Sequence, residues 1–417
     1  MKDHPAPSPQ DITIDEALQR SLSRADIVAG TESLPLNEAS GRILRDNVKA
    51  RINVPQQDTA AVDGYAFHAA DVASAQTPLE VMGSIKAGHP YSQDAPPGFA
   101  YRIFTGAPMP KGPDTVAMEE HCQIGDDGRV IMPDGIKKGA NFRPMGENVK
   151  LGEVVLTSGT RMGPSEIGLA ASIGMDHLTV ASPLRIATLS TGDEVVEAGS
   201  SEGFNEGRLH DSNRPMLASL LTGDGHRILD RGIIRDDRQA LTCCFEQALD
   251  EADAIISTGG SSTGEEDHAR PAIEAAGGNV DFWRLAIKPG RPMAVGWING
   301  KPVFCLPGNP VASFVCYRLM VLPILTAMQG GINLPVLKLP LASGFSHRHR
   351  GDRTEYLRAR VDLNTDGEQA IFIHGRAGAG VLSSLTGADG LVEIPADHGH
   401  VNEGDRLNFI PFRERGL

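Results

Sequence analysis

Apolar and polar positions follow different rhythms in different parts of the chain. Between residues 185 and 330, short apolar runs are separated by stretches with helical spacing. This pattern predicts strands at 185–189, 227–234, 254–257, 280–285, 293–297 and 303–306, and helices at 214–221, 238–251, 270–276 and 311–328. Such alternation is typical of right-handed βαβ units, so we expect a doubly wound, mostly parallel α/β sheet with helices on both faces. Asn299-Gly300 is a strong hairpin signal and predicts one antiparallel edge.

The flanking regions are dominated by short strands. Before the α/β region, strands are predicted at 79–85, 101–104, 115–118 and 129–131, and helices at 13–23, 34–47 and 164–174. Thr13 with Glu16 reads as a capping box, Asn37 as the cap of the second helix, and Pro164 as the first turn of the third. After residue 330, strands at 356–363, 370–373, 390–394 and 406–410 predict a C-terminal β barrel or sandwich.

These patterns divide the chain into a multidomain α/β plus β protein. We predict a disordered tail at 1–10 and a helical linking domain formed by 11–50 and 139–180, whose first helix can pack on the α/β domain. A small β domain follows at 51–138, the α/β domain at 181–330 and the C-terminal domain at 331–417. A chain of 417 residues is too long for one ordinary core, which agrees with several domains.

Composition narrows the partners. The formal net charge is −14, which argues against nucleic acid or an anionic membrane as the main partner. The five cysteines show neither a disulfide framework nor zinc-ligand spacing, so they indicate a reducing, cytoplasmic setting. The first ten residues lack an apolar core, and prolines and Arg318 interrupt the most apolar late stretch, so no signal peptide or membrane span is predicted.

Three polar, glycine-bearing loops follow strands of the predicted sheet. They contribute as candidate ligand-binding residues Thr191, Gly192, Asp193, Ser257, Thr258, Gly259, Gly260, Pro307, Gly308, Asn309 and Pro310. Ligands of open α/β sheets bind beyond the carboxyl ends of the strands, so we expect these loops to share one crevice. Glycines would let backbone N–H groups approach a phosphate, and Asp267 could hold its magnesium. The 257–267 loop matches neither the Walker nor the dinucleotide pattern, so an ordinary turn with solvated acids is the alternative.

Four further polar stretches are candidates for binding or for a structural role. Asp211, Ser212 and Asn213 are a helix N-cap signature that could also accept a phosphate or a pterin edge. Asp236 follows a strand and is either a metal ligand or a cap. Lys288 and Arg291 lie in a proline-stiffened loop suited to an oxyanion. The histidines at 347 and 349, interleaved with arginines, predict a solvated face. No nucleophile-and-base arrangement is evident, which favours electrostatic catalysis with a metal.

Seven motifs stand in the order seen in molybdopterin molybdenumtransferases. They are Asp63-Gly64-Tyr65-Ala66, the run from Arg102 to Pro110, Ser190-Thr191-Gly192-Asp193-Glu194, Asp211-Ser212-Asn213-Arg214, Ser257-Thr258-Gly259-Gly260, Lys288-Pro289-Gly290-Arg291-Pro292 and Leu306-Pro307-Gly308-Asn309-Pro310. The chain therefore resembles the bacterial MoeA family, to which the C-terminal part of gephyrin also belongs. The resemblance covers essentially the whole chain from about residue 12.

This resemblance implies the last step of molybdenum cofactor biosynthesis, in which molybdenum from molybdate enters adenylylated molybdopterin with Mg2+ and AMP leaves. It also implies four domains and an elongated homodimer whose active site lies between the α/β domain of one subunit and the small β domain of the other. Partners would be molybdopterin adenylyltransferase and molybdoenzyme apoproteins. The implied catalytic residues are Asp63, Thr105, Glu194, Asp236 and Asp267. Of these, Glu194 and Asp267 would bind the metal, Lys288 and Arg291 the molybdate or phosphate, and Ser383 or Ser384 would join from the last domain.

Three departures from the family pattern qualify this expectation. Asn148 stands where the family usually has aspartate, His210 where tyrosine is common, and Ser261-Ser262-Thr263 replaces a more apolar stretch. Loss of a carboxylate that serves magnesium or a water would weaken turnover more than binding. The alternative is therefore a weakly active or non-catalytic scaffold that carries molybdopterin or its product. The residues taken without the resemblance also leave open a phosphosugar or nucleotide enzyme.

Overall fold

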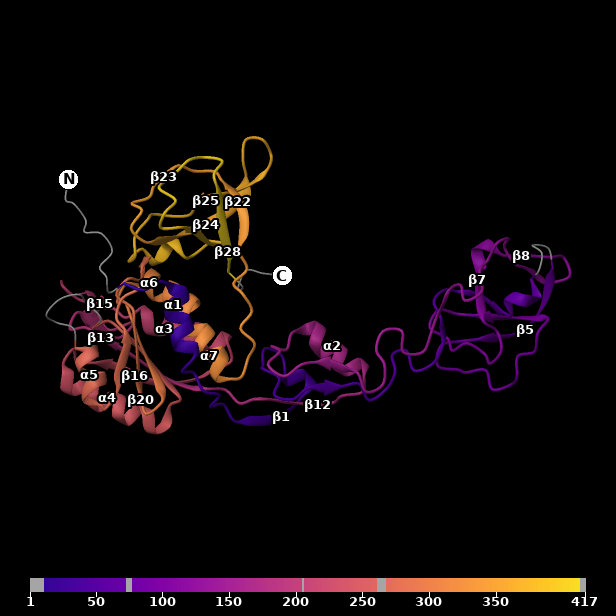
Figure 1. Ribbon diagram of the computed structural model, residues 1–417, viewed down its shortest axis with the longest axis horizontal. Coiled ribbons are helices and arrows are strands. Elements are labelled where there is room, and N and C mark those ends of the chain that lie inside the picture. The colour runs from indigo at the N-terminus through magenta and orange to yellow at the C-terminus, as the bar shows by residue number, and fades with distance from the viewer. Residues whose placement is uncertain (1–10, 73–76, 205, 261–267, 413–417) are drawn as a thin grey trace.

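The computed structural model describes residues 11–72, 77–204, 206–260 and 268–412. Figure 1 shows an elongated molecule. The α/β domain and the C-terminal domain lie together at one end, and the small β domain lies at the other end of a long arm. The arm runs through the linking domain, so the two ends of the molecule are far apart. The tail predicted at 1–10 lies outside the described residues.

A six-stranded sheet with two apolar faces forms the α/β domain. Its strands are β13 (Arg185–Thr191), β16 (Arg227–Ile234), β17 (Ala254–Thr258), β18 (Asn279–Phe282), β20 (Ala294–Ile298) and β21 (Lys301–Leu306). The spatial order is β16-β13-β17-β21-β20-β18. The first four strands in this order are parallel, β20 pairs antiparallel with β21, and β18 pairs antiparallel with β20. Asn299 and Gly300 have φ of 51° and 77°, as a tight hairpin turn requires, so the predicted antiparallel edge is confirmed.

Successive residues of the central strands point to opposite faces and enter different cores. Ile186 and Ile256 pack with helices α1 (Ile14–Leu22) and α3 (Asn213–Gly223), whereas Ala187 and Ile255 pack with α4 (Arg238–Glu251) and α5 (Ala269–Ala275). Helices therefore cover both faces, which confirms the doubly wound prediction. The helix α1 belongs to the core of this domain although it precedes the arm in sequence.

The helix predicted at 311–328 is a composite. It consists of α6 (Pro310–Cys316), a π-helical turn η5 (Tyr317–Val321) and α7 (Leu322–Met328). Pro323 lacks an N–H and would clash with the carbonyl one turn earlier, and a π turn before it relieves that conflict. This stretch is long and apolar enough to cross a membrane, but 72% of it is buried inside the protein. It therefore serves as a core helix that packs against the sheet.

The linking domain corrects one prediction. Strand β1 (Thr31–Pro35) pairs with β12 (His177–Ala181), β2 (Val48–Lys49) pairs with β11 (Val154–Leu156), and α2 (Pro164–Ser172) covers them. The helix predicted at 34–47 is wrong, because only the 3-10 turn η1 (Leu36–Glu38) forms there. Ile43 and Leu44 bury their side chains through bridges to Arg161 and Val180 instead. Long-range strand pairing thus outweighs the local helical pattern.

The small β domain contains the predicted short strands. Its main sheet has the order β7-β4-β6-β5-β9-β8, formed by β4 (Gly64–Phe67), β5 (Pro78–Ile85), β6 (Phe99–Ile103), β7 (Thr115–Met118), β8 (Gln123–Ile124) and β9 (Val130–Ile131). Two further strands, β3 (Thr59–Ala60) and β10 (Phe142–Arg143), pair at its base. The short helices are η2 (Ala69–Asp71) and η3 (Glu119–His121). A turn at 125–128 joins β8 to β9, and the Gly125 N–H donates to the Arg129 carbonyl at 2.9 Å.

The C-terminal domain is a closed five-stranded barrel, which confirms the predicted barrel. It contains β22 (Leu339–Ser343), β24 (Thr354–Leu363), β25 (Gln369–Ile373), β26 (Gly390–Ile394) and β28 (Arg406–Pro411), and pairing of β24 with β26 closes it. A side pair joins β23 (His347–Arg348) to β27 (His400–Val401), and η6 (Leu382–Ser384) follows β25. One short strand of the α/β domain, β19 (Ile287–Lys288), adds to the barrel in parallel with β24. This pairing joins the two domains through their backbones.

His226 makes the stability of the α/β domain dependent on pH. Its side chain lies just before β16, 7% of the residue is exposed, and both ring nitrogens are buried without a hydrogen-bond partner. Burial, with a smaller effect of Arg161, lowers the pKa of His226 from 6.5 to about 4. Below about pH 6.5 the unfolded chain therefore binds a proton on His226, whereas the folded domain keeps this side chain neutral until the pH falls to about 4.

We expect this histidine to cost the folded state about 2 kcal/mol between pH 7 and pH 5. Urea unfolding of the wild type and of His226→Gln across this range measures the effect. The variant should show a correspondingly shallower loss of unfolding free energy as the pH falls. Parallel losses in the two proteins would contradict the assignment.

Candidate functional site

The three predicted loops meet at the carboxyl ends of β13, β17 and β21. The Gly259 N–H donates to the carbonyl of Leu306 at 3.3 Å. Gly259 and Gly260 have φ of 86° and 60°, and a Cβ on Gly259 would lie only 2.0 Å from the carbonyl oxygen of Thr191. Only glycine therefore permits this close approach of two loops. The three predicted loops therefore meet in backbone contact at one edge of the sheet, and we keep the name crevice for this edge.

The start of α3 closes one side of the crevice. Asp211 accepts hydrogen bonds from the N–H groups of Asn213 and Arg214, both at 3.1 Å, and its second oxygen pairs with the Arg214 guanidinium at 3.1 Å. Asp211 is thus a helix cap, as one of the two interpretations had it. Asn213 has a different role, because its Nδ2 donates to the Gly308 carbonyl at 2.7 Å and holds that loop against the helix. Ser212 is half-buried beside them.

Three carboxylates gather beside these loops. Burial raises the pKa of Asp236; His268 and Thr191 oppose the rise, and the charges of Asp193 and Glu194 add to it. Asp193 and Glu194 are exposed, and the Glu194 carboxylate folds over Gly192, where a side chain would lie 2.9 Å from its oxygen. Gly192 has a φ of 141°. Asp193 and Glu194 therefore add negative charge near Asp236, and a bound cation would offset it.

The donor set fits magnesium. One oxygen of Asp236 is buried without a hydrogen-bond partner, and such an atom is costly to leave unsatisfied. Hard oxygen donors with few protein ligands are what Mg2+ prefers, since it keeps several waters. Among the described residues, no three His, Cys, Asp or Glu side chains already surround one point. Asp267, predicted with Glu194 as a metal ligand, lies outside the described residues.

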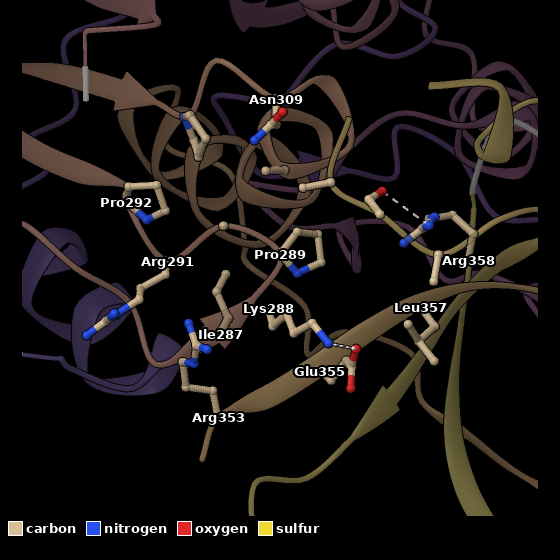
Figure 2. Close-up of a pocket in the computed structure, with 16 residues that line it drawn as sticks. Ile287, Lys288, Pro289, Arg291, Pro292, Asn309, Arg353, Glu355, Leu357 and Arg358 are labelled. Carbon is tan, nitrogen blue, oxygen red and sulfur yellow. Dashed lines mark hydrogen bonds and ion pairs between the residues drawn. The ribbon is translucent and has the colours of Figure 1, made fainter. Parts of the chain in front are cut away.

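A hollow lies between the α/β domain and the barrel. It has a volume of about 400 Å³. Its lining includes four cationic side chains, Lys288, Arg291, Arg353 and Arg358, and one carboxylate, Glu355 (Figure 2). Pro307 and Asn309 also line it, so the loop that follows β21 and contacts Gly259 borders this hollow as well. We call this hollow the cationic cavity.

Each predicted cation of the cavity has an acidic partner. The Lys288 Nζ lies 2.6 Å from Glu355, and Arg291 pairs with the fully buried side chain of Asp11 at 2.9 Å. Figure 2 shows Lys288 and Glu355 facing each other across the cavity wall. Arg358 is buried, and its guanidinium donates to the Ser384 hydroxyl at 2.8 Å and to the Arg376 carbonyl at 3.0 Å. Burial lowers the pKa of Arg358, although the charge of Glu355 opposes this.

The C-terminal domain differs from expectation in two respects. Ser384 is buried and holds Arg358 and the Val381 carbonyl, so it supports the cavity wall, whereas Ser383 is exposed beside it. The histidines predicted to form a solvated face do not. His349 has a side chain only 2% exposed, and both it and His347 bind the Glu355 carboxylate, at 3.2 and 3.0 Å. The solvated-face prediction is therefore wrong, because a buried acid recruits both imidazoles.

The two remaining predicted catalytic residues lie at the far end of the arm. Thr105 donates both its N–H and its hydroxyl to one oxygen of Asp63, each at 2.7 Å, and these bonds lower the pKa of Asp63. Both residues are exposed in the small β domain, far from the crevice of the same chain (Figure 1). Asn148 is exposed in the neighbouring loop, where its N–H donates to the Val54 carbonyl at 2.9 Å.

Comparisons with known proteins agree with this architecture. Residues 12–174 match the MoeA N-terminal region (domains I and II), residues 187–327 a probable molybdopterin binding domain, and residues 340–412 the MoeA C-terminal region (domain IV). The chain is 32% identical over 410 residues to the molybdopterin molybdenumtransferase of Haemophilus influenzae, covering 96% of this chain and 98% of that one. It is 28% identical to gephyrin of Dictyostelium discoideum, covering 95% of this chain and 62% of that one.

A solved structure shows the same fold. The molybdopterin biosynthesis MoeA protein from Pyrococcus horikoshii OT3 superposes with a TM-score of 0.80 at 29% identity, covering 96% of this chain and all of that one. Near-complete coverage in both sequence and structure extends the likeness to all four domains. The chain therefore belongs to the MoeA family of molybdopterin molybdenumtransferases, a family of molybdenum cofactor biosynthesis.

Proposed function

We propose that this chain inserts molybdenum from molybdate into adenylylated molybdopterin and releases AMP, with the help of Mg2+. The observation that carries the proposal is a cationic cavity that shares one loop with an edge of the sheet rich in carboxylates. A carboxylate-rich crevice suits the metal that accompanies a phosphate, and a cationic cavity suits a tetrahedral oxyanion. The loop with Pro307 and Asn309 belongs to both, so it would bring the two substrates side by side.

The side chains divide the work by charge. Lys288, Arg291 and Arg358 would bind the oxyanion, because guanidinium groups present several donors in a fixed geometry and lysine adds a mobile charge. The Gly260 N–H would approach the phosphates of the adenylyl group. Magnesium, when bound, supplies the positive charge that lets a phosphate lie beside carboxylates. Asp236 and Glu194 would hold it, and holding both substrates in one orientation lowers the entropic part of the barrier.

Asp63 and Thr105 enter this proposal through a second subunit. Because the arm places them far from the crevice of their own chain, they would serve the crevice of a partner in a homodimer (Figure 1). A molybdopterin adenylyltransferase would supply the substrate, and a molybdoenzyme apoprotein would receive the product. The cytoplasm is the expected setting, since none of the five cysteines in the described part of the chain forms a disulfide.

Single-turnover release of AMP from adenylylated molybdopterin tests the proposal. We expect release that needs both molybdate and Mg2+, and that is slow or absent when either is left out. Release independent of molybdate would indicate a plain hydrolase. Tight binding of the substrate without any release would favour the carrier alternative.

Replacement of Asn148 distinguishes the enzyme from the carrier alternative. The exposed Asn148 directly follows Glu147, which forms an ion pair with Arg143 at 2.6 Å. If the missing carboxylate limits turnover, Asn148→Asp should accelerate AMP release while leaving substrate affinity unchanged. A carrier would bind the substrate equally well in both forms and release AMP in neither.

A further inference from the structure

Glu355 is an anomaly in a cavity that otherwise attracts anions. Its side chain is 3% exposed, and it lies on β24 at the wall of the cationic cavity. A carboxylate at this place would repel molybdate or any other oxyanion unless its charge were balanced. Burial alone would raise the pKa of Glu355, but hydrogen bonds from Lys288, His347 and His349 hold it below its ordinary value. Glu355 is thus a charged group that depends on its partners.

The two oxygens of Glu355 have different partners. One lies 2.6 Å from the Lys288 Nζ, and the other accepts from the imidazoles of His347 at 3.0 Å and His349 at 3.2 Å. Lys288 is half exposed and can turn toward the cavity, whereas Glu355 is enclosed and cannot follow. The opposing residue of β26 is apolar Ile394. The charged groups around Glu355 are therefore Lys288 on β19, the two histidines from β23 and beyond, and Arg353 and Arg358 on its own side of the cavity.

An oxyanion in the cavity competes with Glu355 for Lys288. When Lys288 turns to the oxyanion, the buried carboxylate loses its neutralising charge, which is unfavourable in a site so enclosed. A proton on a neighbouring imidazole can restore the balance, because both rings already contact the second carboxylate oxygen through a nitrogen. Histidine is the side chain best suited to this exchange near neutral pH.

The surroundings distinguish the two histidines. The His349 side chain is 2% exposed, and its Nε2 is buried with no hydrogen-bond partner. A proton there would create a buried N–H with nothing to accept it. His347 binds Glu355 through Nε2 and keeps 21% of its side chain exposed, so solvent can deliver a proton to the ring. Proton uptake is therefore assigned to His347, and His349 remains a neutral donor.

We propose that Glu355 is a positioning residue that holds Lys288 at the cavity wall, and that His347 takes up a proton when an oxyanion draws Lys288 away. This inference rests on the proposed function, since molybdate is the oxyanion concerned. Lys288, Glu355 and His347 form one proton-linked unit. Oxyanion binding is consequently coupled to proton binding and strengthens as the pH falls through the neutral range.

Isothermal titration of the full-length protein with molybdate tests the coupling directly. Titrations in two buffers of different ionisation enthalpy, at several values between pH 6.5 and pH 8, give the number of protons taken up. We expect a net uptake approaching about one proton and an affinity that rises by up to about tenfold per pH unit. His347→Gln should lose most of the uptake and bind with little dependence on pH.

His400→Gln is the matched control. His400 is exposed on β27, which pairs with β23, so this exchange alters a neighbouring histidine without touching Glu355. It should retain wild-type uptake. Because molybdate is the same in every titration, any proton that binds the anion itself cancels in these comparisons. Thermal unfolding of each variant confirms that the barrel is intact.

Glu355→Gln supplies an independent outcome. A neutral amide competes poorly for Lys288, so this variant should bind molybdate at least as tightly as the wild type at pH 8, with proton uptake lost. Binding by the wild type without proton uptake would overturn this inference and leave the proposed function standing, as would equal uptake in His347→Gln and the wild type. A complete lack of molybdate binding to the folded wild type would overturn both.

Discussion

Asp236→Asn is expected to reduce molybdate-dependent AMP release on the order of 100-fold or more, which is at least the effect of disturbing a metal site. Asparagine has nearly the same shape but cannot supply the negative charge that Mg2+ requires. The carboxylate is unfavourable for folding, because burial and the charges of Asp193 and Glu194 raise the pKa of Asp236. A group whose pKa is raised in the folded state costs stability above its ordinary pKa. The variant should therefore unfold no more easily than the wild type at pH 7.

Asp237→Asn provides the matched control one residue further on. Asp237 caps α4, where its carboxylate accepts the Ala240 N–H at 2.8 Å, and asparagine can cap a helix equally well. Single-turnover AMP release and urea unfolding of the two variants should thus differ sharply in rate and little in stability. Equal loss of activity in both would attribute the effect to the overall charge of this edge of the sheet, and the special role of Asp236 would be rejected.

The α/β domain is the part of the fold that the sequence predicts best. Strand β16 and helix α4 occur at the predicted bounds, because both are bordered by polar breaks and each has a clear apolar period. The segment at 34–47 shows the limit of such patterns. The spacing of Ile43 and Leu44 relative to nearby apolar residues fits a helix. In the structure, however, they pair with Arg161 and Val180, more than a hundred positions away. No local period contains that information.

The candidate site divides in the same way. The crevice could be predicted, because strands of a parallel sheet end at one edge and their loops must meet there. The barrel side of the cationic cavity could not. Glu355 and Arg358 lie in a strand with exposed Arg360, and nothing in their spacing separates the three. Their position depends on β19 adding to β24, a contact between domains that joins Lys288 to a residue 67 positions later. The solvated-face prediction for the histidines at 347 and 349 fails for the same reason, because both bind Glu355.

Complementation between two inactive variants should reveal whether the active site is shared. Asp63→Asn keeps an acceptor for the two Thr105 hydrogen bonds but removes the charge, so the loop should retain its shape and lose its function. In a shared site, a heterodimer of Asp63→Asn with Asp236→Asn has one crevice with both aspartates and one with neither. Purified through two different tags, it should release AMP at about half the wild-type rate, since one of two symmetric sites is complete.

The reciprocal heterodimer gives the opposite result and serves as the control. One subunit is wild type and the other carries both Asp63→Asn and Asp236→Asn. If the site is shared, each crevice lacks one aspartate and the heterodimer is inactive; if each chain is self-sufficient, the wild-type subunit alone retains about half the activity. A shared site therefore predicts activity only in the first heterodimer, and a self-sufficient chain predicts activity only in the second. Misfolding of a variant cannot produce this reversal. Activity in the second heterodimer but not the first would show that the arm brings Asp63 to the crevice of its own chain, which would require a bend of the linking domain that Figure 1 does not show.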